Sequence, residues 1–289
     1  MGNKSTSFNK SMDIIINNRT ICLSTPKIMG ILNVTPDSFF DGGKYGNYDK
    51  MLKKVNQMVS DGADIIDIGA VSTRPGAKNI SVEDELKRLI EPIKLLSSAF
   101  SSTLFSVDTY RAKVAEESIT AGAHIINDIS GGTMDSQMFE TIAALKIPYI
   151  LMHIHGTPQT MQNYPIEKNV VNIVNRFFED SVTKLLELGV ENIILDPGFG
   201  FGKSLESNYE LLANLKKFIT FNLPILAGVS RKSMINKVLN TSPSEALNGT
   251  TSLNTIALQQ GANILRVHDV KEAKEVIDIV GFMNKVTGE

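Results

Sequence analysis

The chain has 289 residues, 42% of them hydrophobic, which is enough to bury one large core and favours a single folded domain. Its 29 basic and 31 acidic residues nearly balance, so the sequence provides no strong field for binding nucleic acid and indicates a small-molecule partner. The single cysteine excludes an internal disulfide and favours a cytoplasmic location, and no apolar run is long enough to span a membrane.

The N-terminal segment divides into a tail and a hairpin. Residues 1–12 are rich in Ser, Asn and Lys and predict a disordered tail, which leaves 13–289 as the folded domain. Residues 14–16 and 19–23 have the pattern of two short strands, and the Asn pair between them can supply the positive φ of a tight turn. We expect this hairpin to plug one end of the domain.

From residue 27 onward, apolar runs alternate with segments of helical periodicity. The runs are apolar at consecutive positions, which is typical of strands in a parallel sheet that is covered on both sides. We expect strands at 28–32, 64–68, 104–107, 125–126, 149–152, 193–195, 225–227 and 263–265. We expect helices at 48–60, 82–99, 112–121, 137–145, 170–188, 209–220, 246–260 and 270–285. Eight such units predict a single (β/α)₈ TIM barrel with an N-terminal β-hairpin.

Polar residues follow every predicted strand, at the end of a barrel where active sites lie. Loops are often polar for no functional reason, and this would account for one or two of these positions. It accounts poorly for polar residues after all eight strands. The residues concerned are Asn33, Ser72 to Arg74, Asp108, Asn127, His153, Asp196, Ser230 to Lys232, and Arg266 with His268. The sequence therefore predicts one active site that is built from many strands.

The segment 198–204, Gly-Phe-Gly-Phe-Gly-Lys-Ser, ends like a phosphate-binding loop. That motif requires a glycine five positions before Gly202, where this chain has Pro197, and the alternate glycines do not match the dinucleotide fingerprint either. We interpret the segment as a tight loop in which glycine lets the backbone and Phe201 approach a flat ligand.

His153 and His155 resemble the metal-binding pair of some barrel hydrolases. In those enzymes the pair ends the first strand, whereas the first strand here ends in Asn33, and only His124 and His268 occur elsewhere. This is a weak zinc signal. We interpret His153 as an inward-facing polar side chain and His155 as a loop residue.

Four polar side chains from different strands are expected to face one cavity: Asp108, Asn127, Asp196 and Lys232. Burying such a group costs free energy unless it pairs with a ligand or with another of the four. They suit a heterocycle with an amino-pyrimidinone edge, because carboxylates accept from ring N–H and amine groups while an ammonium donates to a carbonyl or ring nitrogen. For each of them the alternative is a salt bridge, and Asp196 with Lys232 fits that alternative as well.

The last and first strands suggest a diphosphate site. Arg266 and His268 alternate along one strand and therefore share a face, where two cationic side chains suit phosphate groups. The neutral oxygen of Asn33 suits Mg²⁺, which proteins often hold with few side chains plus phosphate oxygens and water.

Five blocks carry a family resemblance that extends over residues 13–285. They are 33–39 (Asn-Val-Thr-Pro-Asp-Ser-Phe), 67–76 (Asp-Ile-Gly-Ala-Val-Ser-Thr-Arg-Pro-Gly), 196–201 (Asp-Pro-Gly-Phe-Gly-Phe), 230–232 (Ser-Arg-Lys) and 266–269 (Arg-Val-His-Asp). Together they resemble the dihydropteroate synthase family of pterin-binding barrels. The resemblance implies condensation of (7,8-dihydropterin-6-yl)methyl diphosphate with 4-aminobenzoate, a bound Mg²⁺ and a homodimer.

The resemblance also implies roles for individual residues. It assigns pterin binding to Asp108, Asn127, Met152, Asp196, Phe201 and Lys232. It assigns the diphosphate to Asn33, Arg266 and His268, with Asn33 as the metal ligand. It assigns the aminobenzoate pocket to Phe39, Thr73, Arg74, Pro75 and Ser230. Asp37 or Asp41 is expected to stabilise a cation or relay a proton, so the catalytic set is Asn33, Asp37, Asp41, Lys232, Arg266 and His268.

Two competing functions remain at this point. A corrinoid-dependent pterin methyltransferase shares the Asp and Asn pocket, but it needs neither Thr73-Arg74 nor the 230–232 block. A non-catalytic pterin-binding paralogue is disfavoured by the intact diphosphate residues. The main departure from the family pattern is His155, where many members carry arginine or another long polar side chain, and it affects only a peripheral contact.

Overall fold

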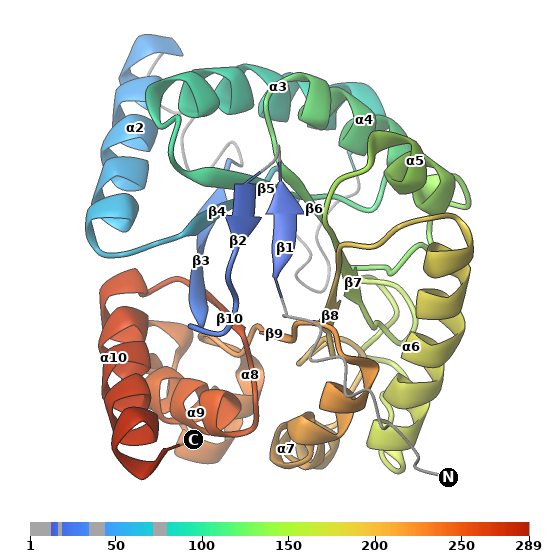
Figure 1. Ribbon diagram of the computed structural model, residues 1–289, viewed down its shortest axis with the longest axis vertical. Coiled ribbons are helices and arrows are strands. Elements are labelled where there is room, and N and C mark those ends of the chain that lie inside the picture. The colour runs from blue at the N-terminus through green and yellow to red at the C-terminus, as the bar shows by residue number, and fades with distance from the viewer. Residues whose placement is uncertain (1–12, 17–18, 35–43, 72–79, 289) are drawn as a thin grey trace, which may run out of the picture.

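A computed structural model describes residues 13–16, 19–34, 44–71 and 80–288 of the chain (Figure 1). Within them, eight parallel strands form one sheet in the order β8-β7-β6-β5-β4-β3-β10-β9, and helices surround it. The main chain closes the ring between β8 and β9, where Leu195 N donates to Pro224 O at 2.8 Å and a bridge joins Leu195 to Ile225. The predicted (β/α)₈ barrel is therefore confirmed.

The strands lie where the apolar runs predict them. They are β3 (Lys27–Asn33), β4 (Ile65–Gly69), β5 (Leu104–Asp108), β6 (Ile125–Asp128), β7 (Tyr149–Met152), β8 (Ile193–Asp196), β9 (Leu226–Ala227) and β10 (Ile264–Val267). Several of them extend into the polar residue that was expected to follow, because Asn33, Asp108 and Asp196 still pair with the neighbouring strand.

The helices agree with the predicted pattern except between β8 and β10. They are α2 (Lys44–Ser60), α3 (Val82–Ala99), α4 (Ala112–Thr120), α5 (Met138–Leu145), α6 (Val170–Glu187), α7 (Leu205–Ala213), α8 (Ser233–Leu239), α9 (Leu247–Gln259) and α10 (Val270–Thr287), with 3₁₀ segments η1 (Leu215–Phe221) and η2 (Pro243–Glu245). None of the helices described is long and apolar enough to cross a membrane.

The prediction of one helix over 209–220 is wrong. Helix α7 begins earlier, at Leu205, because Ser204 Oγ accepts a hydrogen bond from Ser207 N at 3.1 Å and caps the first turn. It ends at Ala213, where Asn214 leaves the helical region with φ −114°, and η1 continues the segment as a tighter turn. Helix α8 was not predicted, because seven residues are too few for a clear periodic pattern.

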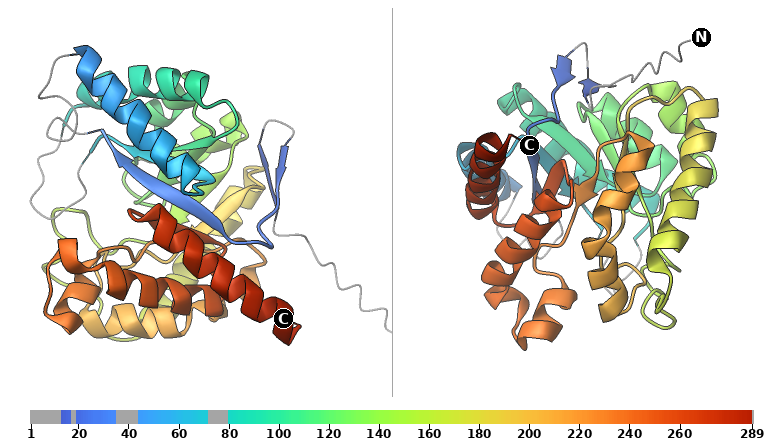
Figure 2. Two further views of the ribbon diagram at one scale, coloured as in Figure 1. Left: turned by 90° about the vertical axis from the view of Figure 1, so that its left-hand side faces the viewer. Right: turned by 60° about the horizontal axis from the view of Figure 1, so that its bottom comes forward.

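The predicted N-terminal hairpin is present, with β1 (Ile14–Ile16) antiparallel to β2 (Arg19–Ile21). Ile14 and Ile16 pack with Leu23 against the first apolar layer inside the barrel, to which every strand contributes one residue: Met29, Ile65, Leu104, Ile125, Ile150, Ile194, Leu226 and Ile264. Figure 2 (left) shows the hairpin at the end where β3 begins. The hairpin therefore closes the N-terminal end of the barrel.

A polar layer lies above this apolar floor. Because alternate residues of a strand share a face, the residues two positions further along β4, β5, β6, β8 and β10 also point into the barrel. They are Asp67, Ser106, Asn127, Asp196 and Arg266. The intervening residues, such as Ile66 and Ile126, face outward into the larger core beneath the helices. The fold thus directs the charged groups toward its C-terminal mouth.

Candidate active site

One ion-pair network joins four strands at the barrel mouth. Asp67 is fully buried, and its Oδ2 accepts from Asn127 Nδ2 at 3.0 Å and from Arg266 Nε at 2.7 Å. Arg266 Nη2 also donates to Asp108 Oδ2 at 2.8 Å. Asn127 and Asp108, which were assigned to the pterin, are therefore both connected to Arg266, which was assigned to the diphosphate. Asp67, which joins Asn127 to Arg266, was not among the predicted site residues.

The network places one guanidinium between two carboxylates. Burial raises the pKa of Asp108 to about 7; Arg266 opposes this rise and the charge of Asp67 adds to it. Burial by itself lowers the pKa of Arg266, but Asp67 and Asp108 outweigh burial and hold that pKa above its usual range. The guanidinium therefore remains charged, whereas Asp108 is able to exchange a proton near neutral pH.

Unpaired acceptors face the same interior. Asp67 Oδ1 and Asn127 Oδ1 are buried and accept no hydrogen bond from the part of the chain that the structure describes. Buried polar atoms usually have partners, so these two acceptors in the barrel mouth are positions where a donor from a ligand would complete the hydrogen bonding. With Nδ2 of Asn127 committed to Asp67, the amide oxygen is the atom that Asn127 can offer to a ligand.

On the opposite side, Asp196 and Lys232 make their hydrogen bonds to the main chain. Asp196 Oδ1 accepts from Gly198 N at 2.8 Å, and Lys232 Nζ donates to Phe199 O while lying 4.8 Å from the centre of the Phe201 ring. Between these two described side chains there is no ion pair, so the simple salt-bridge alternative is wrong.

Burial shifts both of these groups toward neutrality. It raises the pKa of Asp196, although the nearby charge of Lys232 opposes that rise. It lowers the pKa of Lys232 to about 8, although Asp196 works in the other direction. Burial therefore makes the charged form of each group less favourable than it is in water.

The ends of β9 and β10 bring together Ser230 and His268, which were assigned to different substrates. Ser230 Oγ lies 3.0 Å from His268 Nδ1 and accepts from His268 N at 3.2 Å. Arg231 Nε donates to Asp269 Oδ2 at 2.9 Å and so fastens the same two segments. Ser230, which was assigned to the aminobenzoate pocket, is therefore in contact with His268, which was assigned to the diphosphate.

Asn33 is exposed at the end of β3, and Gly69 of β4 pairs with Asn33 on one side and with Asp108 on the other. A Cβ atom added to Gly69 would lie 3.7 Å from Asn33 Oδ1 and 3.5 Å from Asp108 Cβ, so glycine keeps this space open between the two side chains. Over the described ranges, no three His, Cys, Asp or Glu side chains gather into a metal site. The exposed Asn33 supplies a neutral amide oxygen, a donor type that suits Mg²⁺ when phosphate and water complete its coordination.

The two histidines after β7 do not form a metal site. His153 is buried and its ring packs edge-on against Phe177 of α6 at 5.1 Å, so it faces the helix layer and the expectation of an inward side chain is wrong. Burial lowers the pKa of His153 to about 2, which keeps the ring neutral. Met152, one residue earlier, is buried at the end of β7, where a pterin ring was expected to pack.

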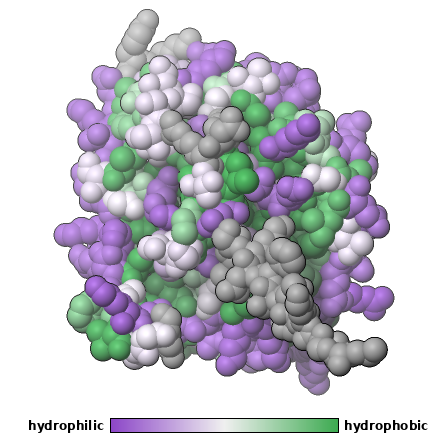
Figure 3. Space-filling view, viewed as in Figure 1, coloured by the Kyte–Doolittle hydropathy of each residue, from purple (hydrophilic) through white to green (hydrophobic). Residues whose placement is uncertain are grey.

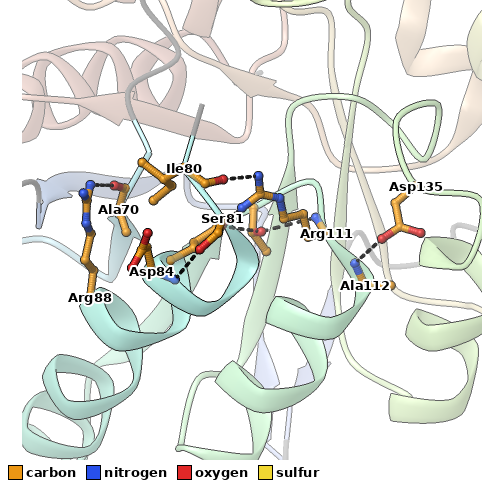
Figure 4. A network of polar contacts seen from close by, with 10 residues as sticks. Ala70, Ile80, Ser81, Asp84, Arg88, Arg111, Ala112 and Asp135 are labelled. Carbon is orange, nitrogen blue, oxygen red and sulfur yellow. Dashed lines mark hydrogen bonds and ion pairs between the residues drawn. The ribbon is translucent and has the colours of Figure 1, made fainter. Parts of the chain in front are cut away.

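Several assigned residues lie outside the described residues: Asp37, Phe39, Asp41, Thr73, Arg74 and Pro75. The described residues on either side of 72–79 are fixed by two arginines, as Figure 4 shows. Arg88 Nη1 donates to Ala70 O at 3.2 Å, and Arg111 Nη2 donates to Ile80 O at 2.6 Å. Buried Glu85 accepts from Arg111 Nη1 at 2.6 Å and fixes that arginine.

A family model described as "Pterin binding enzyme" matches residues 29–268, so the chain is a barrel of the pterin-binding class. Dihydropteroate synthase of Escherichia coli is 46% identical over 93% of this chain and 95% of its own length. The structure of Yersinia pestis dihydropteroate synthase with a sulfonamide drug complex has a TM-score of 0.88 at 43% identity and covers 94% of this chain and 99% of that one. The dihydropteroate synthase of Xanthomonas albilineans with 4-aminobenzoic acid has a TM-score of 0.87 at 35% identity and covers 95% and 98%. The chain belongs to the dihydropteroate synthase family, the transferases of folate biosynthesis.

Proposed function

We propose that the pterin of (7,8-dihydropterin-6-yl)methyl diphosphate binds between the two sides of the polar layer. Asp196 offers Oδ2 to the ring N–H and its amine, because Gly198 N occupies the other oxygen. Asn127 offers its unpaired Oδ1, and Lys232 donates to ring carbonyl or nitrogen. Asp108 completes the pocket, while Met152 and Phe201 contact the ring faces. The convergence of these groups with an unpaired buried acceptor is the observation that carries this proposal.

The diphosphate is proposed to lie against Arg266 and His268 at the end of β10, beside Asn33. Asn33 is the residue that would hold Mg²⁺, since its oxygen is neutral, exposed and close to this end of the barrel. When bound, the ion neutralises charge on the leaving diphosphate. Arg266 and His268 supply the protein's own positive charge there and so stabilise the separating diphosphate.

4-Aminobenzoate is proposed to bind next to the diphosphate, near Ser230. The hydroxyl of Ser230 already contacts His268, so a ligand at this serine lies beside the leaving group. Phe39, Thr73, Arg74 and Pro75 are proposed to complete the pocket. The Xanthomonas albilineans enzyme, whose structure contains 4-aminobenzoic acid, supports this choice of second substrate.

The proposed reaction is a substitution at the pterin methylene group. The C–O bond to diphosphate breaks, the pterin ring spreads the positive charge left on the carbon, and the neutral arylamine nitrogen forms the new C–N bond. The amine loses a proton, and diphosphate departs with both electrons of the broken bond. Asp37 or Asp41 is proposed to stabilise the cation or to relay that proton.

Diphosphate release is the test of this function. We expect release only when both the pterin diphosphate and 4-aminobenzoate are present, with dihydropteroate formed in equal amount. A methyltransferase would release none, and a non-catalytic paralogue would bind the pterin without turnover. Asp180 is exposed on α6, so Asp180→Asn should keep full activity. It is the matched control for the Asp196→Asn variant in this assay.

A homodimer and a cytoplasmic location are also proposed. The outer face of α10 carries an exposed apolar row at helical spacing: Ile279, Phe282, Met283 and Val286. Figure 3 shows an apolar patch over the end of α10, at the lower left of a mostly hydrophilic rim. Light scattering should give a dimer for the wild type and a monomer for Phe282→Glu if a second copy covers this row. The exposed free thiol of Cys22 supports a reducing compartment.

A further inference from the structure

Lys203 is a buried lysine that neither substrate site uses. It lies in the turn between β8 and α7 and is 4% exposed. Its Nζ donates to three main-chain carbonyls: Gly198 O at 2.8 Å, Phe201 O at 3.0 Å and His153 O at 3.2 Å. An ammonium group has three N–H donors, so each of them has a partner.

This coordination joins two strands. Gly198 and Phe201 belong to the turn after β8, whereas His153 follows β7. The turn approaches β7 so closely that a Cβ atom on Gly198, which has φ +70°, would lie 2.0 Å from His153 O. The carbonyl oxygens of Gly198, Phe201 and His153 converge on one ammonium, which offsets the repulsion between their partial negative charges.

The same turn holds the groups that are proposed to bind the pterin. Gly198 N donates to Asp196, so the position of Gly198 sets the direction of that carboxylate. Phe199 O accepts from Lys232, and the Phe201 ring lies beside the Lys232 ammonium. Lys203 therefore holds the main chain on both sides of Phe199.

The hydrogen bonds, rather than the burial, argue for a charged lysine at this position. Burial lowers the pKa of Lys203 well below its usual range, and the charge of Asp196 opposes that shift only in part. A neutral amine has only two N–H donors and would leave one of the three carbonyls unpaired. Three donors on three carbonyls thus make Lys203 a link between the two strands.

We propose that Lys203 is a positioning residue for the pterin subsite, which fixes the 197–203 turn against β7 and thereby orients Asp196, Phe201 and Lys232. It touches neither the ligand nor the reacting atoms. The inference rests on the proposed binding of the pterin by those three residues, and it explains the Gly-Lys-Ser sequence that resembles a phosphate loop without its spacing.

The first test is Lys203→Met, which keeps a similar side-chain length but removes all three donors. Calorimetry should give a dissociation constant for the pterin alcohol, 6-hydroxymethyl-7,8-dihydropterin, that rises roughly tenfold or more, because three buried carbonyls lose their partner and the turn shifts. The affinity for Mg²⁺-diphosphate should stay within about twofold, since Arg266 and His268 lie on another strand. The exposed-lysine variant Lys216→Met is the matched control.

A chemical rescue separates positioning from general stabilisation. Lys203→Cys in a Cys22→Ser background has one thiol, because Cys22 is the only cysteine of the chain. Alkylation of the unfolded protein with 2-bromoethylamine, followed by refolding, restores an ammonium at the same number of bonds from Cα. We expect the pterin affinity to return, whereas alkylation with bromoethane should not restore it.

Defined results overturn the inference. Wild-type pterin affinity in a folded Lys203→Met protein would refute it, and so would an equal loss of pterin and diphosphate affinity. If Lys203→Met does not fold, Lys203→Gln, which keeps two donors, must bind the pterin with intermediate affinity. Asp196→Asn is titrated in parallel: unchanged pterin binding in that variant refutes the pterin subsite itself, whatever Lys203 does.

Discussion

On the β4, β5 and β10 side of the barrel mouth, Arg266 lies between Asp67 and Asp108 and pairs with both at 2.7 and 2.8 Å. On the β8 and β9 side, Lys203 and Lys232 donate instead to main-chain carbonyls, and Asp196 accepts from a main-chain N–H. Ion pairs between side chains therefore fix the position of Arg266. The main chain of one glycine-rich turn fixes the positions of Asp196 and Lys232.

This difference has energetic consequences. Removing one member of a buried ion pair leaves a charge without compensation, which costs more than leaving a neutral carbonyl unpaired. Variants on the Arg266 side should therefore lower both stability and ligand binding. Variants on the Asp196 side should change mainly ligand binding, provided that the turn remains in place.

The largest effect is expected for Arg266→Ala. It leaves Asp67 and Asp108 buried without their cation and should lower the free energy of unfolding by about 3–5 kcal/mol in urea titrations at pH 8. Binding of the diphosphate-bearing substrate should fall far more than binding of the pterin alcohol. The double variant Arg266→Ala/Asp67→Asn should recover part of the stability. Equal weakening of both ligands would make Arg266 a ring or structural contact.

The next effect is expected for Asp196→Asn, with little change in stability. The amide oxygen keeps the bond from Gly198 N, so the amide nitrogen replaces the oxygen that faces the ligand and meets the pterin donors with another donor. Calorimetry should show a loss of pterin binding of about 1–3 kcal/mol, which is at least several-fold. Unchanged pterin binding in the folded variant would contradict the role of Asp196.

A smaller effect is expected from the titration of Asp108, whose pKa rises from 3.8 to about 7. The folded protein keeps a proton that the unfolded chain has lost, so the contribution of Asp108 to stability is greatest below pH 3.8 and declines until about pH 7. Pterin affinity should rise with pH through about 7, because the ionised carboxylate is the better acceptor. Asp108→Asn should remove both dependences, and a pH dependence that persists in that variant must come from another group.

The smallest effect is expected for Ser230→Ala. The variant loses the side-chain hydrogen bond to His268, worth about 0.5–1.5 kcal/mol, and should raise the KM for 4-aminobenzoate a few-fold while leaving pterin affinity unchanged. Initial-rate measurements with each substrate varied in turn would show this. A change confined to the pterin KM would place Ser230 in the other subsite.

The sequence predicts the barrel well because buried parallel strands are continuous apolar runs, and the polar residues that end them mark the mouth. Asp67 was not predicted as a site residue because it lies within such an apolar run, and its partner Arg266 is 199 positions away. That pairing depends on where the barrel closes, and local pattern does not carry this information. Lys203 was visible only as part of a failed nucleotide motif, because its three acceptors are main-chain atoms whose directions follow from the turn.

The hairpin at the floor of the barrel bears on the order in which the protein is made and folded. Ile15 N donates to Asn192 Oδ1, 177 positions later, and Leu23 O accepts from Asn263 Nδ2, 240 positions later. The hairpin segment, which precedes every barrel strand in the chain, therefore completes these contacts only after Asn263 has been synthesised. Ile14 and Ile16 pack against residues from all eight barrel strands, so we expect the hairpin to dock late in folding, after the ring of strands has closed.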